Sequence, residues 1–144
     1  MEENSSIFAD SNYFVALFNP ADALYRNTLP ITRKLNAERR SLVISNFIFL
    51  ETVTIVSQKR GRDVALELGK YLLSDRLIEI IHIDEELQEY SWEVFKRERA
   101  KNLSFVDCSI VAAMKSENIS ELLTFDMKDF KGLQSKYHFQ LYDI

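Results

Sequence analysis

A chain of 144 residues that is 47% hydrophobic is long enough for one globular domain, and we expect residues 1–144 to form one. The net charge of −4 argues against a nucleic-acid partner held by overall positive charge, while the acidic start MEENSS and the lack of a long apolar run predict a cytoplasmic protein with no membrane partner. Cys108 is the only cysteine, His82 and His138 have no partner at zinc-ligand spacing, and the three glycines are widely separated, which excludes a disulfide framework, a structural zinc site and a glycine-rich nucleotide loop.

Apolar runs typical of strands alternate with helical patterns along the chain. The strand-like runs end at Asp10, Asn46, Ile83 and Phe125, and a weaker run lies in HFQLYDI. Helices are predicted over residues 11–18, 21–37, 47–58, 63–73, 85–100 and 105–117, with a kink or restart at Pro30. This alternation predicts an α/β fold of three layers, α/β/α, around a mostly parallel five-stranded sheet.

Four acidic residues stand in otherwise apolar stretches of this pattern. Asp10 and Asp126 follow strand-like runs, Glu51 lies in the helix after the second strand, and Asp107 lies near the start of the helix before the fourth. A helix that leads back into a parallel strand begins at the edge where the strands end. We therefore expect all four acids at the carboxyl edge of the sheet, where open α/β sheets bind ligands.

Most of these acids also have a purely structural explanation. Ser104 and Asp107 fit a capping box, which for Asp107 taken alone is the simpler interpretation. Asp10 fits the N-cap of the helix that follows it. Asp126 fits an ordinary turn acid, and Asp129 an N-cap for a short turn over residues 130–133.

Glu51 is the acid that is hardest to explain structurally. Its neighbours on the same helical face, Phe47, Ile48 and Ile55, are apolar, so a solvated position is a poor interpretation. The remaining structural alternative is a buried partner such as an arginine.

The segments that carry these acids resemble the PIN domain, a nuclease family that includes the VapC-type toxins of toxin–antitoxin pairs. The resemblance covers almost the whole chain and rests on IFADSNYFVALFN, SNFIFLETVTIV, LSFVDCSIVAAMK and LLTFDMKDF. It implies four catalytic and metal-binding acids, Asp10, Glu51, Asp107 and Asp126. It also implies four supporting polar residues, Asn12, Ser104, Thr124 and Asp129. Tyr25 departs from the family pattern, because many relatives have a histidine there.

This resemblance also implies a sheet ordered 3-2-1-4-5 and metal-dependent hydrolysis of RNA phosphodiester bonds by an endoribonuclease. Clustered carboxylates repel one another and offer hard oxygen ligands, which suits Mg²⁺ or Mn²⁺. As a toxin, the protein would have an antitoxin partner and form a homodimer. We expect some of the apolar residues of the first helices to contribute to those interfaces, although a core position is the simpler interpretation of each: Tyr13, Phe14, Phe18 and Phe49.

Two other functions remain open at this point. An aspartate-nucleophile phosphatase would use Asp10, but its motif needs a second acid where Asn12 stands. A non-catalytic PIN-like interaction domain would not need all four acids. If RNA is the substrate, its phosphates need positive contacts, and three groups of basic residues are candidates that also fit solvated helix ends. They are Arg39 and Arg40; Lys59, Arg60 and Arg62; and Lys96, Arg97, Arg99 and Lys101.

Overall fold

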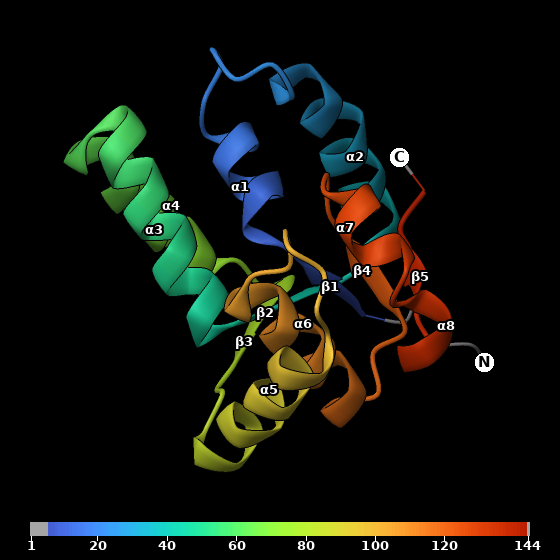
Figure 1. The fold of residues 1–144 in the computed structure, drawn as a ribbon. Coiled ribbons are helices and arrows are strands. Elements are labelled where there is room, and N and C mark those ends of the chain that lie inside the picture. The colour runs from blue at the N-terminus through green and yellow to red at the C-terminus, as the bar shows by residue number, and fades with distance from the viewer. Residues whose placement is uncertain (1–5, 144) are drawn as a thin grey trace.

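The sheet lies at the centre of the molecule with helices on both sides (Figure 1). The computed structural model describes residues 6–143, which form five strands and eight helices. The strands are β1 (Ile7–Ala9), β2 (Leu42–Ser45), β3 (Ile78–Ile81), β4 (Glu121–Leu123) and β5 (Gln140–Leu141). All neighbouring strands are parallel, in the order β3-β2-β1-β4-β5. The predicted order and fold class are therefore confirmed.

Helices connect each strand to the next. They are α1 (Ser11–Leu17), α2 (Tyr25–Glu38), α3 (Asn46–Arg60), α4 (Arg62–Ser74), α5 (Glu85–Arg97), α6 (Phe105–Ser116), α7 (Met127–Lys131) and α8 (Gln134–Tyr137). The three residues of the central strand β1 are fully buried, as expected for a strand covered on both faces. Within residues 6–143, no helix has the length and apolarity needed to cross a membrane.

Several predicted boundaries were wrong because side chains form turns there. The second helix begins at Tyr25 rather than at residue 21, since Asn19 and Asp22 accept hydrogen bonds from the backbone two residues further on. It then continues through Pro30, which is exposed, so that water can satisfy the carbonyl that lacks a donor. The third strand ends at Ile81 rather than Ile83.

Two further differences concern where a helix and a strand end. The fifth helix ends at Arg97, three residues earlier than predicted. In HFQLYDI only Gln140–Leu141 is a strand, and Ile144 lies outside the described residues.

The apolar residues expected at interfaces divide into two groups. Tyr13 and Phe14 belong to the core, with 1% and 0% of their surface exposed, so the core interpretation is confirmed for both and neither contributes to an interface. The reason is that α1 contacts both α2 and α3 and thus has little free surface. Phe18 and Phe49 are half-buried. The large apolar side chains that are exposed lie elsewhere: Leu24, Leu50, Leu66, Leu73, Trp92 and Phe95.

Candidate active site at the carboxyl edge of the sheet

Asp10 directly follows the central strand β1 and lies at the centre of the site. It is the N-cap of α1, with 4% of its surface exposed, and its Oδ1 accepts a hydrogen bond from the backbone N–H of Ser11 at 2.7 Å. The hydroxyl of Thr124 donates to its Oδ2 at 2.8 Å. Burial raises the pKa of Asp10 to about 7, although these hydrogen bonds act in the opposite direction. A structural role as a cap and a chemical role are thus combined in one carboxyl.

Glu51 reaches the same place from the second turn of α3. Its Oε1 accepts a hydrogen bond from the hydroxyl of Ser11 at 2.5 Å, so its partner is a serine and the arginine considered from the sequence is wrong. The serine hydroxyl also lies 3.5 Å from Oδ1 of Asp10. Ser11 therefore joins two of the acids. The only sequence signal for this role was its place between Asp10 and Asn12.

Asp107 occupies the first turn of α6 and forms the predicted capping box. Its Oδ2 accepts from the backbone N–H of Ser104 at 3.0 Å, and its own N–H donates to the Ser104 hydroxyl at 3.0 Å. Burial raises the pKa of Asp107, and the negative charges of Asp126 and Glu51 add to this effect. Asp107 is therefore a helix cap, and its carboxylate also interacts with the negative charges of the other acids.

Asn12 and Thr124 hold the ends of β1 and β4 together. The amide of Asn12 donates to the Thr124 hydroxyl at 3.2 Å and more weakly, at 3.4 Å, to Asp10, and its carbonyl oxygen accepts from the N–H of Phe125 at 3.1 Å. The Thr124 hydroxyl also accepts from the N–H of Asp126 at 3.0 Å. Both supporting residues therefore fix the positions of the acids next to them.

Asp126 follows β4 and is exposed. It stands at the N-cap position of α7 but makes no capping hydrogen bond with its side chain, so capping does not account for it. Asp129 is not an N-cap, as the sequence suggested, because α7 already begins at Met127 and includes it. Its backbone N–H donates to the carbonyl of Asp126 at 3.1 Å.

The four acids interact through their charges. The negative charges of Asp107 and Glu51 raise the pKa of Asp10, and those of Asp126 and Glu51 raise the pKa of Asp107, so the four acids form one electrostatically connected group. Among the residues that the structure describes, however, no three His, Cys, Asp or Glu side chains are arranged to hold one metal ion on their own. A cation bound here would keep water in part of its coordination shell, as Mg²⁺ commonly does, or would draw the carboxylates closer.

Comparisons with known proteins agree with this arrangement. The profile of the PIN domain family matches residues 7–134. The chain is 29% identical over 121 residues to the 23S rRNA-specific endonuclease VapC20 of Mycobacterium tuberculosis strain H37Rv. The aligned residues cover 83% of this chain and 88% of that protein. The crystal structure of M. tuberculosis VapC20, a sarcin–ricin loop cleaving toxin, has a TM-score of 0.76 at 27% identity, covering 88% of this chain and 93% of that one. VapBC2 from Rickettsia felis, bound to a DNA fragment, shares the fold, with a TM-score of 0.65 at 21% identity over 96% of this chain and 99% of that one.

Proposed function

Since the chain belongs to the PIN domain family, we propose that it is a metal-dependent endoribonuclease whose active site is formed by Asp10, Glu51, Asp107 and Asp126. The observation that carries this proposal is the gathering of these carboxylates at the carboxyl edge, where burial raises the pKa of Asp10 to about 7. Repelling carboxylates in a partly buried site are stabilised by a cation. The similarity to VapC20 supports RNA as the substrate.

The donor set fits Mg²⁺ or Mn²⁺. All candidate ligands are carboxylate oxygens, which hard divalent cations prefer, and Mg²⁺ is commonly bound by one or two carboxylates together with water. Asp10, Glu51 and Asp107 would hold the ion directly or through water, and Asp126 would complete the shell. When bound, such an ion lowers the pKa of a coordinated water and neutralises charge on the phosphate.

The neighbouring polar groups keep the carboxylates in place for this task. Ser11 and Thr124 orient the side chain of Asp10, and Ser11 also orients that of Glu51. Ser104 fixes one oxygen of Asp107 by its backbone N–H. Hydrogen bonds thus pre-position Asp10, Glu51 and Asp107, and none of the three belongs to an ion pair within residues 6–143, so their negative charge remains available to a cation.

Cleavage of RNA tests the proposal directly. Purified wild type should cut RNA with Mg²⁺ or Mn²⁺ and stop when EDTA is added. Asp107→Asn should be inactive, while Glu67→Gln, a matched change at an exposed acid of α4, should cleave normally. Cleavage that survives both EDTA and Asp107→Asn would reject a metal-dependent nuclease at this site.

The similarity to VapC20 also supports a role as the toxin of a toxin–antitoxin pair, active in the cytoplasm and inhibited by an antitoxin protein. Expression in the native host without that antitoxin should arrest growth, and Asp10→Asn should abolish the arrest. Growth that continues despite a correctly folded wild-type product would reject the toxin role and leave a processing nuclease.

A homodimer is part of the same proposal. Leu66 and Leu73 of α4 have 61% and 70% of their surface exposed, and Trp92 of α5 has 49%, so apolar surface is available for burial between two copies. Light scattering should give twice the mass of the 16.8 kDa chain. A monomer mass at tens of micromolar would reject the dimer.

A further inference from the structure

The three groups of basic residues do not lie equally near the acids. Arg40 pairs with Glu121 at 2.8 Å, at the start of β4 and hence at the edge opposite the acids. Lys59 and Arg60 end α3, about 12 Å along the helix axis beyond Glu51. Of these three groups, the one nearest to an acid along the chain is therefore that of residues 96–101, which lead into α6.

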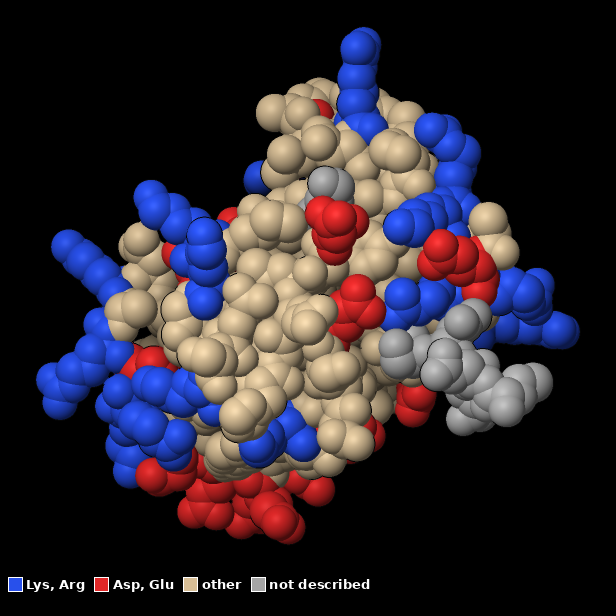
Figure 2. All heavy atoms as spheres, turned by 90° about the vertical axis from the view of Figure 1, so that its right-hand side faces the viewer, with Lys and Arg blue, Asp and Glu red and all other residues tan. Residues whose placement is uncertain are grey.

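Charge on the surface is gathered rather than evenly spread. Figure 2 views the molecule from the side where α2, α8 and β5 lie, and its lysines and arginines lie mostly toward the margins, around a central area of largely uncharged residues that also holds some acidic side chains. Two members of the 96–101 group are already engaged: Lys96 pairs with Glu93 at 2.9 Å, and Arg97 donates to the hydroxyl of Tyr137 at 3.2 Å. Lys101 has no such ion pair among the described residues.

A cleft of about 340 Å³ separates the segment 98–103 from the region of α7. Lys101, Asn102 and Leu103 line one side, and Lys128, Asp129 and Leu133 line the other. Lys101 stands three residues before Ser104 of the capping box, and Lys128 stands two residues after Asp126. The two lysines therefore line one cleft, and each lies a few residues along the chain from an acid of the site, Lys101 from Asp107 and Lys128 from Asp126.

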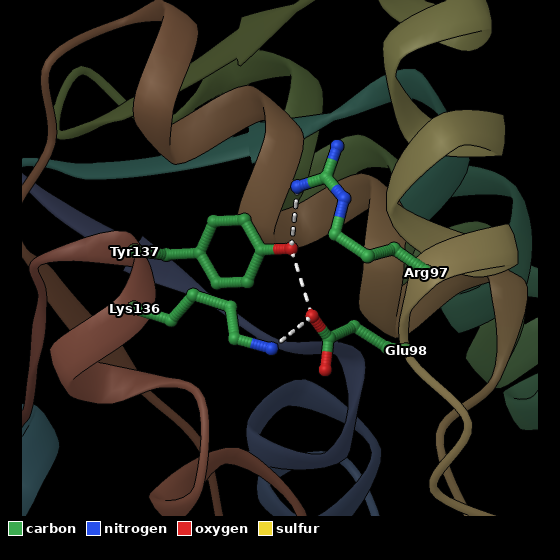
Figure 3. A network of polar contacts seen from close by, with 4 residues as sticks. All are labelled: Arg97, Glu98, Lys136 and Tyr137. Atoms are coloured by element: carbon green, nitrogen blue, oxygen red, sulfur yellow. Dashed lines mark hydrogen bonds and ion pairs between the residues drawn. The ribbon is translucent and has the colours of Figure 1, made fainter.

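A network of polar contacts holds one wall of this cleft (Figure 3). The carboxylate of Glu98 accepts from Nζ of Lys136 at 2.8 Å and from the hydroxyl of Tyr137 at 3.0 Å. The side chain of Glu98 is only 10% exposed, so these contacts tie the end of α5 to α8. Although burial by itself would raise the pKa of Glu98, its hydrogen bonds to Lys136 and Tyr137 lower it.

The charges of the cleft leave an excess of positive charge. Glu98 also lines it, but its charge is balanced by Lys136. Asp129 is the other acid, against the two lysines Lys101 and Lys128, and neither lysine belongs to an ion pair of the described residues. The volume lies near the lower end of small-ligand sites, roughly 300–1,000 Å³, which suits a group about the size of one nucleotide.

We propose that this cleft binds an RNA phosphate next to the one that is cleaved, with Lys101 and Lys128 as its contacts. The inference rests on the proposed ribonuclease function. Lysine binds phosphate as a point charge and needs no fixed geometry, which fits two exposed lysines that converge from separate segments. It also shows how a protein of net charge −4 can hold a polyanion: locally, beside its acidic centre.

The salt dependence of RNA binding tests the cleft. Fluorescence anisotropy with a labelled single-stranded RNA, at 50 to 300 mM KCl and with Mg²⁺, would use an Asp107→Asn background so that the RNA is not cut. Adding Lys101→Gln and Lys128→Gln should weaken binding several-fold and reduce the slope of log K against log salt by about 0.7, the value for one phosphate on a single strand. Adding Lys70→Gln and Lys115→Gln instead makes the same change in net charge at exposed lysines of α4 and α6, and should leave the slope unchanged.

The outcomes separate the inference from the function on which it rests. An unchanged slope in the cleft variant, or equal changes in both variants, overturns the cleft as a phosphate site even if the wild type cleaves RNA. Failure of the wild type to cleave RNA with either metal ion overturns the proposed function, and the inference falls with it.

Discussion

Replacing Asp10 by asparagine should stabilise the metal-free protein increasingly as the pH rises. Burial raises the pKa of Asp10 to about 7, against 3.8 for the ordinary carboxyl, so the folded protein keeps this proton where the unfolded chain has lost it. Wild-type stability therefore falls as the pH rises from about 4 to about 7. The whole effect is on the order of 4 kcal/mol, at 1.36 kcal/mol per pKa unit, and roughly 2 to 3 kcal/mol of it lies between pH 5 and pH 8.

Asparagine does not titrate, and its side-chain oxygen can still accept from the N–H of Ser11. Urea unfolding in EDTA at pH 5 and pH 8 should therefore show the advantage of Asp10→Asn over wild type growing by that amount. Glu67→Gln, at an exposed position, should parallel wild type at both values. If Asp10→Asn also parallels wild type, the folded protein does not hold a proton on Asp10 and the reasoning is refuted.

Three further substitutions test single contacts. Thr124→Val removes a hydroxyl that lowers the pKa of Asp10, so the acid limb of the pH–rate profile should move upward, and an unmoved limb would count against this contact. Asp126→Asn should change the free energy of unfolding in urea by less than about 0.5 kcal/mol, because the side chain is exposed, while most cleavage is lost; normal cleavage would remove Asp126 from the site. Tyr137→Phe removes the hydroxyl at the centre of the network in Figure 3 and should cost on the order of 1 kcal/mol in the same titration, whereas no cost would mean that the network contributes nothing.

The edge that carries the acids was predictable because it follows from a pattern that depends on the backbone. Buried parallel strands need apolar residues on both faces, and SIFAD and SLVISN meet that need without alternation. Asp10 and Asp126 follow such runs, and Glu51 and Asp107 lie in helices that begin at the same edge, so their meeting place did not require any knowledge of side-chain contacts. Resemblance to the PIN domain supplied the order 3-2-1-4-5, which the alternation alone leaves open.

The hydrogen-bond partners of side chains that are far apart in the sequence were not predictable, because they depend on which side chains meet in three dimensions. Ser11 joins Glu51 over 40 positions of sequence, and its place between Asp10 and Asn12 does not reveal that partner. The network of Glu98 with Lys136 and Tyr137 spans a similar separation. The predicted start of the second helix was wrong for a different reason. The sequence does not distinguish a polar side chain that accepts a hydrogen bond within a turn, as Asn19 and Asp22 do, from one that is exposed on a helix surface.

Asp107 is the acid for which a structural role and a chemical role both fit the contacts, and two substitutions separate them. Asparagine at this position keeps an oxygen that can accept from the N–H of Ser104, so Asp107→Asn should preserve the capping box and fold with near wild-type stability. Ser104→Ala removes the hydroxyl that accepts from the N–H of Asp107 and should cost about 1 kcal/mol.

Cleavage should show the opposite order. Ser104→Ala keeps all four carboxylates and should cleave RNA well per folded molecule, whereas Asp107→Asn loses a charge that a cation would need and should be inactive. Urea titration gives the folded fraction of each variant, and single-turnover cleavage with Mg²⁺ gives the rate for that fraction. If Asp107→Asn unfolds easily yet cleaves like wild type per folded molecule, Asp107 is a helix cap only, and the metal site must be built from the other three acids.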